Sequence, residues 1–396
     1  MLVYRPLRGW LIGRFNPQLA LWALFLRRFA AGNEPQRKTG KPQRTQRDTK
    51  ENPEATEDTE EYGEKHSKPL VGGGWPIIPV FGEAGVKSFI LLILLGGVAF
   101  GQSTAGTAAA KQQLLWTKLG AKIGEIDQKL DGVMGVAIED LSSGQTFLLH
   151  ADEVFPQASS IKIAVLAELY RQSQAGGQGN AKLTDLYAVQ AADLVPDSDI
   201  MGGLTPGVTR MTNRDLATMM VAVSDNSATN VLIDHVGMEN VNKLMDTLGL
   251  SHTRLRRKMM DLKAAGEGRE NISTPREMMT LLESIYRGKV LNKDVTDDFF
   301  KMLSTHKESF IPRDLPPDLK IANKPGELEG VRNDSGIVFA VNRPYVICVM
   351  TTYLKNERSG EDAISRVSTV AYDMFDRLGR ASEYGRVVSA GNGGKP

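Results

Sequence analysis

The chain has 396 residues, of which 41% are hydrophobic and 24% are charged, and its formal net charge is +1. This length and composition are typical of a globular protein with one large core or two smaller ones. The balanced charge gives no electrostatic reason to expect nucleic acid or an anionic membrane surface as a partner. The single cysteine, Cys348, excludes an intrachain disulfide, and its apolar neighbours predict a buried, unreactive thiol.

The first hundred residues differ in composition from the rest of the chain. Residues 36–68 are almost all Lys, Arg, Glu, Asp, Gln, Thr and Pro, which is typical of a disordered segment because too little apolar surface can be buried. The hypothesis is that residues 1–85 are a disordered or spurious extension of the natural protein. N-terminal sequencing of the native protein tests it, since finding these residues in the mature chain would contradict it.

A signal-peptide pattern follows that extension. Lys87 precedes an apolar run over residues 89–101, and Ala99 and Gly101 fit the small residues of a cleavage site. Residues 86–101 are therefore interpreted as a signal peptide, with an uncleaved membrane anchor as the alternative. Either interpretation places the rest of the chain outside the cytoplasm, in the periplasm or secreted.

The patterns after the signal-like segment predict strands at both ends of one domain and helices between them. The predicted elements are a helix over 108–126, strands over 133–139 and 146–150, a mainly helical region over about 159–288, strands over 319–323, 336–341 and 345–353, and a helix over 360–378. The expected fold class is α/β of the α+β kind, with a five-stranded antiparallel sheet built from both termini and an inserted all-helical lobe. The domain is expected over 108–380, followed by a flexible tail over 381–396.

Ser159 and Lys162 stand at the start of the most apolar helix of this region. From Ile161 to Tyr170 nearly every residue is apolar, which predicts a helix that is buried on all sides. A lysine there is costly unless it is paired or its pKa is lowered. Ser159 lies on the same helical face, and a neutral lysine amine can activate a serine hydroxyl. The alternative is that Ser159 or Ser160 only caps the helix and Lys162 extends to solvent.

Two further motifs decide between these interpretations. Ser224-Asp225-Asn226 follows a helical run, and Lys324-Pro325-Gly326 follows a predicted strand. The order S-x-x-K, S-D-N, K-x-G resembles that of the class A β-lactamases and penicillin-binding proteins. The resemblance extends over residues 108–378 and includes connecting segments such as 253–257 and 273–275. It implies the β-lactamase/transpeptidase-like fold.

The resemblance also implies catalytic roles. Ser159 would attack the acyl carbonyl, and Lys162 would help to take its proton. Ser224, bridging Lys162 and Lys324, would relay a proton to the leaving nitrogen. Lys324 would lend positive charge to Ser224 and to the carboxylate of the substrate.

Other matching residues would bind the substrate. Asn226 would hold the side-chain amide of the substrate, and Gly326 belongs to the substrate-binding part of the K-x-G motif. The backbone N–H groups of Ser159 and Glu327 would form the oxyanion hole. Arg332, on the following strand, resembles an arginine that binds the substrate carboxylate in some class A enzymes, with a surface ion pair as the alternative. Asn230 is expected to hold a loop in place.

The sequence departs from the family where the acyl-enzyme is hydrolysed. Class A enzymes activate the deacylating water with the glutamate of an E-x-x-L-N pattern, and here Met259 and Lys263 occupy its glutamate and asparagine positions. A thioether cannot accept a proton, so the acyl-enzyme should persist or use another base. Asp261 is the candidate replacement, with an ion pair to Lys258, Arg256 or Arg257 as the alternative. Pro325 also replaces the usual threonine and removes a hydroxyl and an N–H group.

The expected function is that of a class A-like β-lactamase, a serine hydrolase that opens the β-lactam amide through an acyl-enzyme on Ser159. The alternatives are a D-Ala-D-Ala-type peptidase or esterase of the same fold, and an acylatable protein that binds β-lactams without hydrolysing them. The expected partner is a β-lactam or a peptidoglycan-derived acyl donor. No cofactor, metal or nucleic acid is expected, a membrane contact only through residues 86–101, and the chain is expected to be a monomer.

Overall fold

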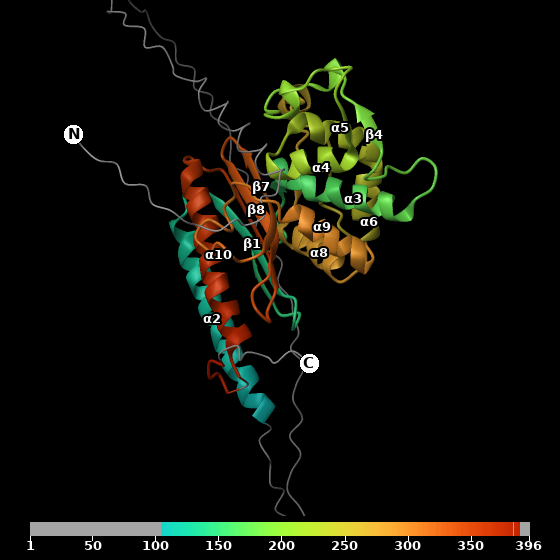
Figure 1. Ribbon diagram of the computed structural model, residues 1–396. Helices are drawn as coiled ribbons and strands as arrows, with labels where there is room; N and C mark the ends of the chain where they lie inside the picture. Colours follow the sequence, from blue (N-terminus) through green and yellow to red (C-terminus); the bar gives the residue numbers. More distant parts are fainter. Residues whose placement is uncertain (1–103, 383, 389–396) are drawn as a thin grey trace, which may run out of the picture. The chain divides into compact units, whose positions relative to one another are not determined.

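The computed structural model describes residues 104–382 and 384–388 (Figure 1). The predicted segments 1–85 and 86–101 and the last eight residues of the predicted tail lie outside the described residues. In the described part of the chain, no helix is both long and apolar enough to cross a membrane. The described start of the tail forms a turn in which Ala381 and Val387 make a β-bridge.

The central feature of the domain is a five-stranded sheet in the order β2-β1-β9-β8-β7. All four strand pairs are antiparallel. The strands are β1 (Val133–Asp140), β2 (Thr146–Leu149), β7 (Ile321–Leu328), β8 (Val331–Val338) and β9 (Tyr345–Thr352). Strands from the two ends of the domain therefore share one sheet, as predicted, and β7 is an edge strand.

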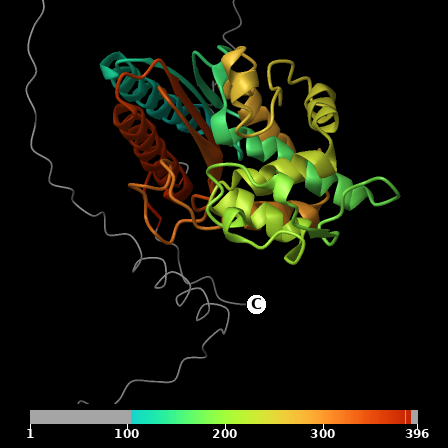
Figure 2. The ribbon, with the colours of Figure 1, turned by 90° about the horizontal axis from the view of Figure 1, so that it is seen from above.

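Helices cover both faces of this sheet. The long helices α2 (Thr104–Lys129) and α10 (Glu357–Arg380) pack on one face, and the helical lobe packs on the other (Figures 1 and 2). Successive side chains of β9 alternate between the two cores, so that Ile347 faces α2 and α10 whereas Cys348 faces the lobe. Burial raises the pKa of the Cys348 thiol to about 12, and the thiol is buried as predicted.

The helical lobe surrounds α3, which is buried on all sides over residues 162–170 as its sequence predicts. Its helices are α3 (Lys162–Ala175), α4 (Asn213–Ala222), α5 (Asn226–Val236), α6 (Met238–Thr247), α7 (Leu262–Gly266), α8 (Pro275–Tyr286) and α9 (Lys293–Leu303). Side chains cap the N-termini of several of these helices. The Thr212 side chain accepts a hydrogen bond from Asp215 N at the start of α4, and the Asp225 side chain accepts one from Ala228 N at the start of α5. The short strand pairs β3 (Phe155–Pro156) with β6 (Ile272–Ser273), and β4 (Leu186–Ala188) with β5 (Arg210–Thr212), brace its loops.

The β7–β8 hairpin differs from the prediction, which placed these strands over 319–323 and 336–341. Their true extents bring the K-x-G motif into β7 itself. The error has a physical cause, because the first half of β8 contains the buried polar residues Asn333, Asp334 and Ser335 instead of a regular apolar pattern. Asp334 accepts hydrogen bonds from Phe310 N, Ile311 N and the Asn323 side chain. Pro325 is tolerated within β7 because an edge strand need not donate every N–H group.

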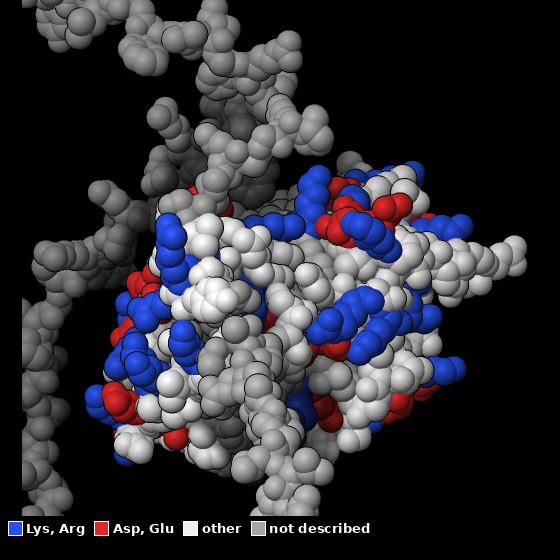
Figure 3. Space-filling model, turned by 90° about the horizontal axis from the view of Figure 1, so that it is seen from below, with Lys and Arg blue, Asp and Glu red and all other residues white. Residues whose placement is uncertain are grey.

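Basic and acidic side chains stand next to one another over the face drawn in Figure 3. Ion pairs at the surface of the described residues include Arg276–Asp152 and Arg313–Asp362. The mixed surface accords with the formal net charge of +1.

Candidate active site

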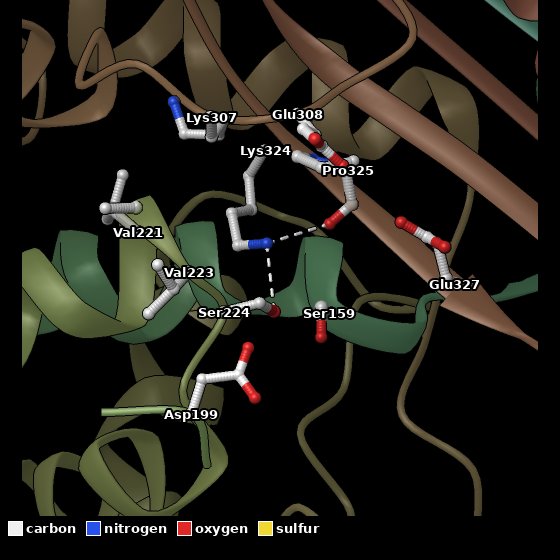
Figure 4. A pocket seen from close by; sticks show the side chains of 11 residues that line it. Ser159, Asp199, Val221, Val223, Ser224, Lys307, Glu308, Lys324, Pro325 and Glu327 are labelled. Atoms are coloured by element: carbon white, nitrogen blue, oxygen red, sulfur yellow. Dashed lines mark hydrogen bonds between the residues drawn. The ribbon is translucent and has the colours of Figure 1, made fainter. Parts of the chain in front are cut away.

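Ser159 lies in a short 3-10 helix, η1 (Ala158–Ile161), that leads directly into α3. The prediction placed Ser159 at the start of the α-helix itself, whereas α3 begins at Lys162. Ala158 has φ +48°, an uncommon value for a residue with a Cβ, which marks a constrained backbone beside Ser159. Ser160 is buried and donates to Gln157 O at 2.6 Å. Ser159 is only partly buried and lies in the pocket of Figure 4.

The Lys162 amine is buried, with 1% of the residue exposed. It lies 2.6 Å from Ser224 O, 2.9 Å from Ser224 Oγ and 2.9 Å from Asn226 Oδ1. Burial and, secondarily, the charge of Lys324 hold the pKa of Lys162 well below its usual value. A neutral amine fits these partners: its two N–H groups can bond the two carbonyl-type oxygens, while the Ser224 hydroxyl donates to its lone pair.

No hydrogen bond joins Lys162 Nζ to Ser159 Oγ, and within the described residues the Ser159 hydroxyl makes none to any side chain. The expected direct contact of the two groups is therefore replaced by contacts of Lys162 with Ser224 and Asn226. The alternative in which Lys162 extends to solvent is excluded by its burial.

Ser224 connects the two lysines, as predicted. It lies between α4 and α5 with φ +58°, and its hydroxyl is 3.1 Å from Lys324 Nζ as well as 2.9 Å from Lys162 Nζ (Figure 4). The neighbouring Asp225 fixes this loop by accepting hydrogen bonds from Met201 N at 2.8 Å and Ala228 N at 2.9 Å. The loop therefore holds the Ser224 hydroxyl between two amines.

Lys324 is buried in β7, and its amine also donates to Pro325 O at 3.1 Å. Burial and the nearby charge of Lys307 lower the pKa of Lys324 to about 7. Lys324 thus changes its charge near neutral pH, in direct contact with the Ser224 hydroxyl.

Gly326 brings β7 into backbone contact with η1. A Cβ at this position would lie 2.5 Å from Gln157 O, 2.8 Å from Ser160 N and 3.1 Å from Ser159 N, so that no larger residue fits without a shift of the backbone. This close approach places Glu327 on the rim of the pocket that Ser159 also lines.

The pocket has a volume of about 350 Å³. It is lined by Ser159, Asp199, Val221, Ala222, Val223, Ser224, Lys307, Glu308, Lys324, Pro325 and Glu327. Three polar members were not predicted from the sequence: Asp199, Lys307 and Glu308. The Lys307 amine donates a hydrogen bond to Leu303 O, at the end of α9, at 2.8 Å, and burial lowers the pKa of this amine to about 8. None of the three belongs to a motif, and only the fold brings them to the site.

Comparison with known proteins agrees with this arrangement. The model of the β-lactamase enzyme family matches residues 118–375 of the chain. The chain belongs to the β-lactamase enzyme family. The predicted resemblance and the β-lactamase/transpeptidase-like fold are therefore confirmed.

Proteins similar to this β-lactamase-family protein include β-lactamases and PBP-A. β-Lactamase SME-1 of Serratia marcescens is 28% identical over 304 residues, covering 73% of this chain and 97% of that protein. A crystal structure of β-lactamase from Sphaerobacter thermophilus has 30% identity and a TM-score of 0.58, and covers 65% of this chain and 96% of its own. PBP-A has 26% identity and a TM-score of 0.60, covers 66% of this chain and 97% of its own, and a mutant of PBP-A is known as an acyl-enzyme complex with penicillin G.

Five predicted site residues of this β-lactamase-family protein are not among the residues that line the pocket: Lys162, Asn226, Gly326, Arg332 and Asp261. Lys162 and Gly326 contact residues that do line it, and Asn226 contacts Lys162, whereas Arg332 and Asp261 are engaged elsewhere. The Arg332 guanidinium pairs with Glu361 of α10 at 3.2 Å and donates to Leu328 O and Val331 O at 2.8 Å, as the ion-pair alternative would have it. Asp261 caps α7 by accepting from Ala264 N at 2.9 Å. Two of the three partners suggested for Asp261 are engaged elsewhere, Lys258 with Asp234 and Arg257 with Glu270.

Met259, which the sequence analysis matched to the family's glutamate, is buried with 7% exposed. Its backbone is fixed by one side chain: Asn230 Nδ2 donates to Met259 O at 3.0 Å, and Met259 N donates to Asn230 Oδ1 at 2.8 Å. The prediction that Asn230 holds a loop in place is confirmed. The backbone at Met259 is therefore firmly anchored, and its side chain is buried.

Proposed function

We propose that the protein is a class A-like β-lactamase that forms an acyl-enzyme on Ser159. Its relatives named as β-lactamases support a β-lactamase-like function. The observation that carries the proposal is the Ser224 hydroxyl, which lies within hydrogen-bond distance of both buried amines, Lys162 and Lys324. A hydroxyl in this position can accept a proton from Lys162 and donate its own proton to the leaving nitrogen.

In the proposed acylation, the Ser159 oxygen bonds to the β-lactam carbonyl carbon while its proton passes to the neutral Lys162 amine. The developing negative oxygen is stabilised by the backbone N–H groups of Ser159 and Glu327, each such donor contributing roughly 3–4 kcal/mol. As the carbon–nitrogen bond breaks, Ser224 gives its proton to the leaving nitrogen and receives one from Lys162. The charge of Lys324 attracts the carboxylate of the substrate.

A second candidate function is favoured by Met259. Because its thioether cannot take a proton from water, the acyl-enzyme is expected to be long-lived, as in an acylatable protein that binds β-lactams without hydrolysing them. Asp261 remains the proposed replacement base, but its role as the cap of α7 gives this proposal little support.

A chromogenic cephalosporin combined with mass spectrometry separates the candidates. Continuous colour development supports a β-lactamase. One burst followed by a stable adduct on Ser159 supports an acylatable protein or a D-Ala-D-Ala-type peptidase. Cleavage of p-nitrophenyl esters without any reaction with β-lactams supports an esterase and would contradict the proposed function.

Restoring a carboxylate at position 259 is expected to shorten the life of the acyl-enzyme. Met259→Glu should raise the deacylation rate about 100-fold, the usual contribution of a general base, and leave the acylation rate nearly unchanged. The deacylation rate is measured by mass spectrometry as the decay of the Ser159 adduct after free β-lactam has been removed. Met259→Leu, which conserves volume without adding a base, is the matched control. Equal decay in the two variants would show that residue 259 does not face the acyl group.

The acylation rate is expected to depend on the charge of Lys324. Burial and the charge of Lys307 lower the pKa of the Lys324 amine, and the carboxylates of Asp334 and Glu327 raise it, for a net value of about 7. Below this pH the ammonium attracts an anionic substrate, and above it the attraction is lost. Between pH 6 and pH 9 the acylation rate constant of an anionic cephalosporin should fall about tenfold relative to that of a neutral p-nitrophenyl ester. Parallel pH profiles for the two substrates would count against this role.

A further inference from the structure

The lining of the pocket differs on the two sides of Ser224, because both lysines lie on one side and a single carboxylate lies on the other. Lys324 and Lys307 lie on one side, and the carboxylate of Asp199 lies on the other, facing Ser224 and Ser159 (Figure 4). Asp199 comes from the loop between η2 (Ala191–Asp193) and η3 (Met201–Gly203), far in the sequence from the three motifs.

The backbone around Asp199 is firmly held against the start of α5. Ser198 Oγ lies 2.8 Å from Ser227 Oγ and accepts from Ser227 N at 2.9 Å. On the other side, Ile200 N donates to Asp225 Oδ2 at 3.2 Å. Asp199 is thus fixed to the same turn that positions Ser224, while its side chain is exposed in the pocket.

The Asp199 carboxylate makes no hydrogen bond or ion pair with any residue of the described ranges 104–382 and 384–388. The other carboxylates of the pocket, Glu308 and Glu327, lie on the side of Lys324 (Figure 4). Glu327 also lies 3.9 Å from Arg332. Among the residues that line the pocket, Asp199 therefore supplies the carboxylate that lies across Ser224 from Lys324.

We propose that Asp199 determines specificity by favouring acyl donors that carry an ammonium group in their acyl part. The inference rests on the proposed function, in which the carboxylate of the leaving part lies at Lys324 and the scissile carbonyl lies at Ser159. The acyl part then extends past Ser224 on the side of Asp199, where an ammonium can pair with the free carboxylate. Because the pair would be exposed to solvent, it should contribute only a roughly two- to fivefold preference.

Ampicillin and penicillin G provide a matched pair of probes, because ampicillin differs only by an α-amino group, which is protonated at pH 6. The second-order rate constant for adduct formation on Ser159 is measured for both by mass spectrometry. In Asp199→Asn the ratio of the ampicillin constant to the penicillin G constant should fall roughly two- to fivefold. High salt should reduce the ratio in the unsubstituted protein.

The control variant is Glu125→Gln, which removes the same charge from the exposed surface of α2 on the other face of the sheet. It should leave the ratio unchanged. An unchanged ratio in Asp199→Asn would overturn the inference, as would an equal slowing of both penicillins, which would indicate a role in folding or in the chemistry itself. If neither penicillin acylates the unsubstituted protein, the proposed function is overturned and the preference falls with it.

Discussion

Replacing Ser159 with alanine is expected to abolish covalent labelling by every β-lactam and to lower any cephalosporin turnover by about 10⁴-fold or more. The reason is that no other hydroxyl is both in the pocket and free to attack. Ser224 lines the same pocket, but its hydroxyl is held between the Lys162 and Lys324 amines. Intact-mass analysis after incubation with a β-lactam gives the first readout, and the initial rate with a chromogenic cephalosporin gives the second.

The neighbouring Ser160 supplies the control for this substitution. Its hydroxyl is buried and lies within hydrogen-bond distance of two acceptors, Gln157 O at 2.6 Å and Gln157 Oε1 at 2.8 Å, so Ser160→Ala should lower the free energy of unfolding by roughly 1–3 kcal/mol. It should still form the adduct on Ser159. An adduct that survives in Ser159→Ala and disappears in Ser160→Ala would reassign the nucleophile.

Gly326→Ala is expected to have the second largest effect, because its methyl group would collide with the backbone of Gln157 and Ser160. The strand β7 would have to move away from η1, and Lys324 and Glu327 would move with it. A displacement of this kind changes the geometry of the oxyanion hole, and the loss of a single such donor lowers rates by about 100- to 1,000-fold. Acylation should fall by about this factor, and overpacking should lower the free energy of unfolding by roughly 1–3 kcal/mol.

Gly124→Ala is the matched control for this change. Gly124 lies in α2, and a Cβ there would have no neighbouring atom within 4 Å. The substitution should leave acylation unchanged and stabilise the helix by roughly 0.5–1 kcal/mol. Stopped-flow acylation and thermal unfolding distinguish the two variants, and normal acylation by Gly326→Ala would mean that β7 does not set the geometry around Ser159.

The sheet and the buried helix α3 could be predicted because their apolar patterns are long and regular. The sequence around Lys162 is apolar on every side, and burial on every side is what the structure shows. The β7–β8 hairpin could not be delimited in the same way. Its buried polar residues, above all Asp334, are stabilised by hydrogen bonds from residues that only the fold brings near, and such partners leave no periodic signal.

Those residues of the candidate site that belong to sequence motifs could be predicted. Ser159 and Lys162 lie where η1 leads into α3, Ser224 lies between α4 and α5, and Lys324 lies within the edge strand β7. The fold brings these three places together, so that Ser224 contacts both lysines. Asp199 and Lys307 could not be predicted, since isolated charged residues in loops most often lie on solvated surface. The two interpretations of Arg332 could not be separated from the sequence, because an arginine near a motif can bind substrate or can tie a hairpin to a helix, as its ion pair with Glu361 does here.

The position of β9 within the sheet has a consequence for biosynthesis. This strand lies between β1 and β8 and pairs with both, although it is the last of the five strands to leave the ribosome. Until residue 352 has been synthesised, β1 and the β7–β8 hairpin have no common neighbour to join them. A truncated product that stops before β9 would expose two unpaired strand edges, which are prone to aggregate. The ability of Ser159 to react with a β-lactam should therefore appear only after β9 has been synthesised, when nearly the whole domain has been made.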